Sequence, residues 1–406
     1  MEKMGKRLTL IDSLRGLSLF GILVSNMLIF QYGIYGKEKI EFYHLHTFDE
    51  AMYIFSKIFF ETSFLPIFLF LFGYSIILLR NKLEENGKRI KWHLFRRFLL
   101  LIMFGILHSI FVWEGDILLT YGFLGIVTLM FVNRKPKTIL YWIIGIYAMV
   151  ILFVIFSSFF LEETAEEDNE QINAYIQKEY DTYSTGSYAE IFNFRMNEEP
   201  PENFSDVEYF IIFLLMLFMT CPILLLGMYA AKCGWFTNPF LNKRKYGIIA
   251  AFLIPLGLIL KSIPYLFKDL SFGDAAYSIG GPVLAFGYIF IFSYFYCGEG
   301  QKYLTYFKSI GRLSMTNYLF QSLICTTIFY GYGLALFGKL GVFTGIILAV
   351  VIFQCQAFIS RLYLKKWKTG PFEKLMRIGT YLSWNGKVKP NTKKVENFDR
   401  NIEITP

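Results

Sequence analysis

Apolar runs recur along the whole chain, and each is long enough to cross the hydrocarbon core of a bilayer. They are roughly 16–25 residues long, and a core of about 30 Å requires about 20 residues of helix. The runs produce a composition that is 55% hydrophobic and 19% aromatic, with 45 Phe and 27 Tyr. A soluble chain of 406 residues could not bury that much apolar surface. The sequence therefore predicts an all-α, polytopic integral membrane protein, because a helix satisfies its own backbone polar groups inside lipid.

We expect about ten transmembrane helices in a single membrane domain, residues 1–406. The predicted spans are 14–30, 54–79, a helical pair within 98–133, 138–161, 208–231, 246–264, 279–297, 313–330 and 342–360. Between the fifth and sixth spans lies a long acidic loop, 162–207, and a basic tail covers 361–406. Within the loop, 163–180 can form an amphipathic helix that caps one face, and the alternative is a solvated surface.

The basic residues predict the orientation of the chain. Lys and Arg are concentrated in the loops after the even-numbered spans, and such loops face the cytoplasm. Both termini are therefore expected in the cytoplasm, with 162–207 outside, in the plasma membrane of a bacterium. The net charge of +8 does not indicate nucleic-acid binding, because the basic residues cluster between spans. The five Cys show no CxxC spacing and are typical of membrane packing.

Three polar residues share one face of the first span. Asp12, Arg15 and Asn26 follow helical 3-4 spacing, and Asp12 and Arg15 can pair at the cytoplasmic end. Asn26 lies about 21 Å further out at the rise of an α-helix. Taken alone, Asp12 is also typical of a helix N-terminus. That alternative explains neither of the other two residues.

His108 lies inside an apolar run, shortly before the turn that contains Asp116. An ionisable side chain at membrane depth is costly, so His108 should face the bundle interior or a wet cavity. The turn folds the second helix back, so the two side chains can meet. A neutral imidazole oriented by a carboxylate can act as a general base. The alternative is a histidine hydrogen-bonded to a neighbouring helix for packing.

Two further histidines lie in the first external loop. His44 and His46 have Asp49 close by, and they are second candidates for a catalytic role. Their HxH spacing can bind metal, but no third ligand is evident, and we predict no metal site.

The segment 311–322, GRLSMTNYLFQS, places four polar residues on one face near the cytoplasmic end of the ninth span. They are Ser314, Asn317, Tyr318 and Gln321. These groups need partners within the bilayer, so the face must turn inward. Interhelical hydrogen bonding and ligand binding are equally compatible with it.

Five stretches carry a resemblance that covers nearly the whole chain. They are DSLRGLSLFGILVSN (12–26), FLFLFG (68–73), GILHSIFVWEGDILLTYG (105–122), GRLSMTNYLFQS (311–322) and WKTGPFEKLMR (367–377). Their order resembles that of the YeiB-like family of bacterial multi-span proteins. The opening D-x-x-R-G…N is also similar to the wider transmembrane acyltransferase superfamily, which includes the lysosomal heparan-glucosamine acetyltransferase. In that enzyme an Asn occupies the Asn26 position and a first-loop His performs the transfer, a part that His44 or His46 would take here.

The resemblance implies acyl transfer across the membrane. An acyl-CoA co-substrate would enter from the cytoplasm near Arg15, Arg312 and 365–377, and Asp12, Asn317, Tyr318 and Gln321 are the other candidate binding residues. The acceptor would be a sugar, a lipid or a small molecule. His108 or a first-loop His would deprotonate it, and Asn26 would stabilise the oxyanion. The alternatives are a small-solute transporter and a lipid- or partner-binding protein without catalysis, and a homo-oligomer is compatible with each.

Overall fold

The computed structural model describes residues 9–160, 168–201, 204–267, 270 and 272–386, and this part of the chain contains helices and no β-strand. The prediction of an all-α polytopic membrane protein is confirmed. In the first half the helices are α1 (Thr9–Tyr32), η1 (Ile40–Tyr43), α2 (Thr47–Phe59), α3 (Phe64–Glu85), α4 (Ile90–Phe111), α5 (Leu118–Thr128), α6 (Pro136–Phe160), α7 (Asp168–Thr185) and α8 (Tyr188–Asn197). In the second half they are α9 (Asp206–Lys232), η2 (Pro239–Asn242), α10 (Lys243–Leu266), α11 (Gly273–Tyr296), α12 (Gln301–Leu304), α13 (Phe307–Arg312), α14 (Ser314–Phe329), α15 (Val342–Lys366) and α16 (Pro371–Tyr381).

Within the described residues, seven helical segments are long and apolar enough to cross a membrane. They are α1, the bent pair α2–α3, α4, α9, α10 with η2, α11 and α15. Three further predicted spans correspond to shorter apolar segments: α5, α14 and Pro136–Leu152 of α6. The total of about ten spans stays a prediction.

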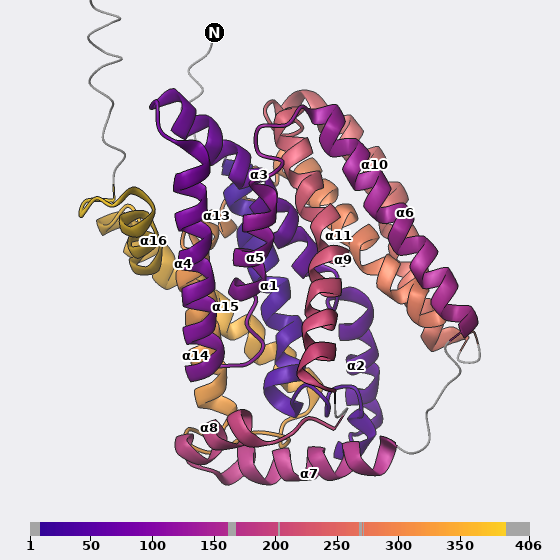
Figure 1. Ribbon diagram of the computed structural model, residues 1–406. Coiled ribbons are helices and arrows are strands. Elements are labelled where there is room, and N and C mark those ends of the chain that lie inside the picture. The colour runs from indigo at the N-terminus through magenta and orange to yellow at the C-terminus, as the bar shows by residue number, and fades with distance from the viewer. Residues whose placement is uncertain (1–8, 161–167, 202–203, 268–269, 271, 387–406) are drawn as a thin grey trace, which may run out of the picture.

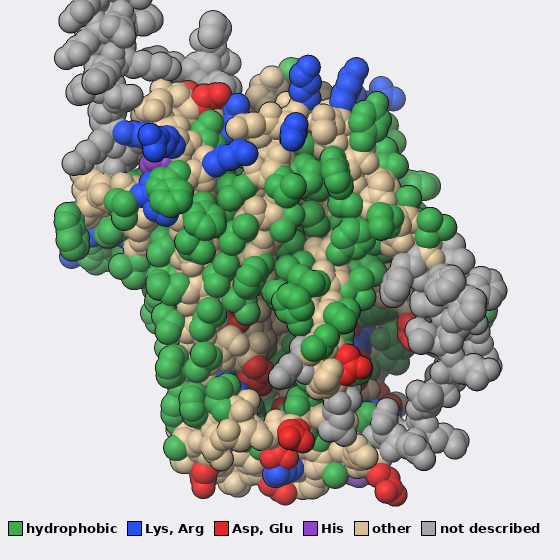
Figure 2. Space-filling view, in the orientation of Figure 1, with side chains coloured by type: hydrophobic (Ala, Val, Ile, Leu, Met, Phe, Trp, Pro, Cys, Tyr) green, Lys and Arg blue, Asp and Glu red, His purple; other side chains and the backbone are tan. Residues whose placement is uncertain are grey.

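The two ends of the bundle differ in charge. α16 and the start of α1 lie toward one end, and α7 and α8 lie across the opposite end (Figure 1). Lys and Arg gather at the first end and most visible Asp and Glu at the second, with an apolar band between them (Figure 2). This polarity is the one expected for a basic cytoplasmic face, and the orientation itself stays a prediction.

The predicted second span is interrupted. We expected one helix over 54–79, but α2 ends at Phe59 and α3 begins at Phe64. Thr62, in the connection, has a positive φ of 57°, which is strained for a β-branched residue. Pro66 lies in the first turn of α3, where its missing N–H is tolerated. In a continuous helix the Pro66 ring would clash with the carbonyl of Thr62, four residues earlier, and the break before α3 removes this clash.

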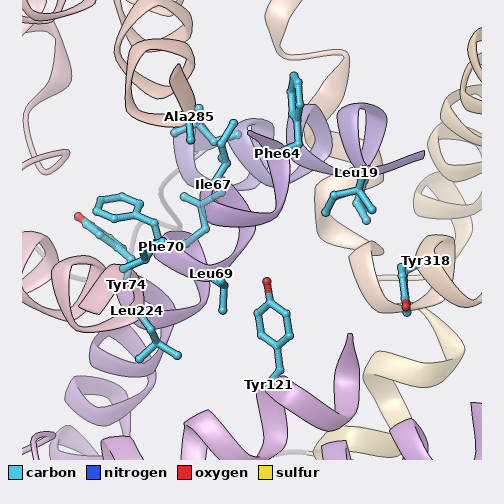
Figure 3. Packing of buried hydrophobic residues seen from close by; sticks show 14 of the residues in the cluster. Leu19, Phe64, Ile67, Leu69, Phe70, Tyr74, Tyr121, Leu224, Ala285 and Tyr318 are labelled. Carbon is cyan, nitrogen blue, oxygen red and sulfur yellow. The ribbon is translucent and has the colours of Figure 1, made fainter. Parts of the chain in front are cut away.

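α3 is central to the packing. Its buried side chains Phe70 and Ile67 lie near α9 and α11, and Leu224 and Ala285 contribute from those helices (Figure 3). Tyr121 of α5 lies close to α3 and makes a T-shaped ring contact with Phe72, with 5.0 Å between the ring centroids. The contacts of α3 therefore extend to α5 as well as to α9 and α11.

Two glycines let α1 and α13 approach closely. A Cβ on Gly16 would lie 2.1 Å from the carbonyl oxygen of Phe307, and one on Gly311 would lie 1.8 Å from that of Asp12. Backbones this close exclude any side chain, as in small-residue helix interfaces of membrane proteins. The glycines of the 12–26 and 311–322 motifs therefore fit against one another.

The acidic segment is folded onto the bundle. α7 covers most of the predicted amphipathic helix, and Glu163 lies outside the described residues. Ile176, Tyr183 and Ile191 of α7 and α8 are almost completely buried. The amphipathic interpretation is thus closer to the structure than a solvated loop.

Candidate functional site

His108 and Asp116 are in contact inside the bundle. The Nδ1 atom of His108 lies 2.8 Å from Oδ1 of Asp116. Both side chains are almost fully buried, at 3% and 1% exposure. A carboxylate accepts hydrogen bonds only, so the proton of a neutral imidazole must lie on Nδ1. The lone pair is then on Nε2, which is buried and has no hydrogen-bond partner among the described atoms.

The turn after α4 brings the two residues together. Asp116 Oδ2 also accepts from the backbone N–H of Leu119 at 2.8 Å, in the first turn of α5. Gly105, one turn before His108, allows this close return, since a Cβ there would lie 2.4 Å from the nitrogen of Leu119. The carboxylate is therefore fixed by the start of α5 while it holds the imidazole, an arrangement that orients a general base.

Tyr318 of α14 is the third member of this group. Its hydroxyl accepts from the N–H of Ile117 at 3.1 Å and lies 3.4 Å from Asp116 Oδ1, to which it can donate. The rings of His108 and Tyr318 have centroids 5.4 Å apart. Sequence reasoning placed Tyr318 in a separate binding face. The structure instead places it beside Asp116.

A cavity of about 530 Å³ extends from the basic end of the bundle to Tyr318. Six cationic side chains line it, against the single carboxylate of Glu373: Arg15, Lys82, Arg97, Arg312, Lys368 and Arg377. Its apolar wall consists of Phe68, Phe72, Ile76, Leu79, Leu101, Leu118, Met315 and Met376. Its lining also includes Tyr121, and Ile117 and Tyr318, which are hydrogen-bonded to each other beside Asp116. The cavity thus has the chemistry to hold a ligand with an anionic part and an apolar part.

Arg15 and Asp12 form the expected pair. The guanidinium donates to Asp12 Oδ1 at 3.1 Å and also contacts the hydroxyl of Ser75 on α3. Arg15 therefore faces the cavity from a fixed position, while Asp12 lies almost fully buried behind it. Arg312 donates to the carbonyl of Lys368 at 3.1 Å, and this bond joins the end of α13 to the segment before α16.

The polar face of α14 divides into two parts. Ser314 and Tyr318 line the cavity, whereas Asn317 and Gln321 face α15. Asn317 bonds Ser360 at 3.0 Å, and Gln321 bonds Gln356 at 3.0 Å. Residues one apart on a helix differ by about 100° in direction, which separates the two pairs. For Asn317 and Gln321 the structure supports the packing alternative rather than ligand binding.

The remaining candidate residues are Asn26, His44 and His46. Asn26 is half-buried on α1, and no hydrogen bond among the described residues joins it to the imidazole. His44 and His46 are exposed, and His44 lines a separate groove of about 680 Å³ under α7. Asp49 does not orient either histidine: its Oδ1 accepts from the N–H of Phe343 at 2.9 Å, at the start of α15. In the described part of the chain, no group of three or more His, Cys, Asp or Glu is arranged to hold a metal ion.

The sequence analysis missed a buried ionic cluster at the α2–α3 break. Glu61 pairs with Lys37 at 2.6 Å and Lys57 at 2.9 Å, and Tyr277 donates to it at 2.8 Å. Lys261 of α10, which is completely buried, donates to the freed carbonyl of Glu61 and to the hydroxyl of Ser63. Charges at 57, 61 and 261 within apolar runs were the available signal.

Comparison with known proteins gives relatives without a stated activity. Residues 230–383 match the model of a family described as protein of unknown function (DUF418). The chain is 31% identical over 399 residues to the uncharacterised protein YxaH of Bacillus subtilis, covering 93% of this chain and 95% of the relative. It is 25% identical over 391 residues to the uncharacterised protein YeiB of Escherichia coli, covering 90% and 94%. A 39.9 kDa protein of Bacillus acidopullulyticus is also 25% identical, over 93% of this chain.

Proposed function

The chain belongs to the DUF418 family of proteins of unknown function, and we propose that it is a membrane-embedded acyltransferase. It would move an acyl group from a cytoplasmic acyl donor to an external or lipid-linked acceptor. One observation carries the proposal: the cationic cavity reaches Tyr318, whose hydroxyl touches the carboxylate that holds His108. A donor site and a base are thereby adjacent. The bacterial relatives support placing this membrane protein in a plasma membrane.

The cavity suits an acyl-CoA as donor. Arg15, Arg97 and Arg377 present guanidinium groups, which bind phosphate oxygens in a bidentate way. The aromatic and aliphatic wall would hold the acyl chain beyond the charged mouth. A small acyl group on the donor, such as acetyl or butyryl, would then point toward Tyr318.

The proposed chemistry uses His108 as general base. Its free Nε2 takes the proton from an acceptor hydroxyl as the oxygen attacks the thioester carbonyl carbon. The C–O bond forms, the C–S bond breaks, and the thiolate receives the proton back from the imidazolium. Asp116 fixes the tautomer and stabilises the positive charge of His108 between the two proton transfers.

Tyr318 would keep the Asp116 carboxylate in place through its hydroxyl. Asn26 remains the proposed donor to the oxyanion, and His44 and His46 remain external alternatives as the base. Their exposure at the outer face would suit an acceptor that is a sugar or another hydrophilic molecule.

Calorimetry with acyl-CoA thioesters tests the donor assignment. Purified protein should release heat on binding acetyl-CoA or a longer thioester, and Arg15→Gln should bind about 10- to 150-fold more weakly, since a hydrogen bond to a charged group contributes ~1.5–3 kcal/mol. Exposed Lys374→Gln is the matched control, because Lys374 does not line the cavity. If the wild-type protein gives no heat with any thioester, the donor assignment fails.

A small-solute transporter is the second candidate, and the break between α2 and α3 favours it. Transporters often place binding sites at discontinuous helices, and here the freed backbone and the buried Lys261 ammonium meet at such a break. The two functions separate experimentally. An acyltransferase turns over its donor in detergent, whereas a transporter requires sealed vesicles and a gradient.

A further inference from the structure

The outer helices α7 and α8 grip the end of α4 just after His108. Arg195 of α8 donates through Nη2 to the carbonyl of Ile110 at 3.1 Å and lies 3.4 Å from Glu114 through Nη1. Its side chain is only 5% exposed. Ile110 and Glu114 lie on either side of the end of α4, two and six residues after His108. One guanidinium therefore spans the point where the helix stops and the turn begins.

Further contacts from the same segment repeat this grip. The hydroxyl of Tyr188 donates to the carbonyl of Phe111 at 2.7 Å. Tyr183 of α7 donates to the other oxygen of Glu114 at 3.4 Å. The last carbonyls of a helix have no partner within the helix. Here the carbonyls of Ile110 and Phe111 accept from Arg195 and Tyr188 of α8 instead.

We propose that α7 and α8 form a clasp that holds the His108–Asp116 turn in place, with Arg195 as its positioning residue. The clasp is defined by the contacts of Arg195, Tyr188 and Tyr183 with residues 110–114. Since the imidazole is buried, an external acceptor reaches it only when this segment moves. The acidic external segment is thus part of the site that the proposed function requires. The proposal rests on that function only for the role of His108, and the position of the clasp is independent of it.

The clasp predicts which substitutions expose His108. In Arg195→Gln the charge that links Ile110 and Glu114 is lost, so the end of α4 opens more often. Each ~1.4 kcal/mol of lost contact energy raises the open population about tenfold, and we expect at least that increase in the reactivity of His108. Arg195→Lys keeps a positive charge beside Glu114, so the reactivity of His108 in this variant should lie between those in the wild type and in Arg195→Gln. Tyr188→Phe removes a single hydroxyl from an exposed side chain and should give a smaller increase in the same direction.

Diethyl pyrocarbonate labelling of the purified protein in nanodiscs tests this. The reagent modifies neutral imidazoles, and mass spectrometry of peptides reports each histidine separately. The exposed His46, which does not line the groove under α7, serves as an internal reference whose rate should not change. Lys178→Gln is the matched control, since Lys178 is a cation of α7 that pairs with Glu198 and does not touch α4.

Faster labelling of His108 in Arg195→Gln and Tyr188→Phe, with unchanged labelling in Lys178→Gln, is the expected result. Equal His108 rates in the wild type and both clasp variants would overturn the clasp. Where Arg195→Gln fails to fold, Tyr188→Phe still decides. None of these readings depends on acyl transfer, so a failed clasp leaves the proposed function standing, and a failed transferase leaves the clasp standing.

Discussion

Replacing Glu373 by glutamine should loosen α16 from the start of α14. Oε1 of Glu373 accepts from the N–H groups of Met315 at 2.9 Å and Thr316 at 3.1 Å. Its Oε2 accepts from the hydroxyl of Thr316 at 2.6 Å. A carboxylate from one helix thus occupies the N-terminal cap of another, where it also lines the cationic cavity.

The magnitude follows from these three bonds. Glutamine keeps one carbonyl oxygen for the two N–H donors, and its amide group can donate to the rotated hydroxyl of Thr316. What it loses is the charge, which makes a hydrogen bond roughly twice as strong. At about 0.7 kcal/mol for each bond, the attachment of α16 to α14 through Glu373 weakens by about 2 kcal/mol. Glu373→Ala removes all three bonds and should cost about 4 kcal/mol.

Hydrogen exchange of the α16 peptide, measured by mass spectrometry, is the direct assay. A loss of about 2 kcal/mol in a local opening equilibrium corresponds to about 30-fold faster exchange. Lys374→Gln, an exposed charge change on the same helix, should leave the rate within about threefold. An exchange rate in Glu373→Gln that matches this control would refute the attachment of α16 through Glu373.

Three further predictions concern other parts of the chain. Burial raises the pKa of the Glu179 carboxyl well above its usual value, and the nearby Glu114 adds to the shift. The stability that protonated Glu179 contributes is therefore complete below the pKa of the unfolded state and is lost as the pH rises through the pKa of the folded state. Proteolysis within α7 should consequently speed up from pH 5 to pH 8 in the wild type and not in Glu179→Gln. Lys261→Met should cost about 3 kcal/mol of unfolding free energy in mixed micelles, because it removes the ammonium that donates to both the Glu61 carbonyl and the Ser63 hydroxyl, and a more stable variant would contradict this. A single cysteine at Thr185 should react with an impermeant reagent in intact cells, and labelling only after permeabilisation would reverse the proposed orientation.

The sequence predicts contacts that are local along the chain. His108 and Asp116 are eight residues apart across a tight turn, so their meeting follows from the turn alone. Asp12 and Arg15 are neighbours on one helical face and likewise pair as expected. Helix periodicity is sufficient for such contacts.

Contacts between distant segments were not predictable in this way. Tyr318 reaches Asp116 from 202 positions away, and a shift of one residue on α14 decides that Asn317 faces α15 instead. The ionic cluster joins α2 to α10: Lys57 and Glu61 are only four residues apart, but hydropathy alone could not place Lys261, 200 positions from Glu61, beside them. Tertiary packing supplies this information, and it decides which polar residues form a site.

Acyl-donor turnover in His108 and Asp116 variants tests the central claim most directly. Protein in nanodiscs made from bacterial lipid extract would be given acetyl-CoA, and the released thiol would be followed with a thiol-reactive dye. We predict that His108→Gln and Asp116→Asn each lower the rate about 10²–10⁴-fold and that the double variant is little worse than His108→Gln, because the two residues act as a unit. Wild-type turnover in His108→Gln, with unchanged folding, would contradict the account.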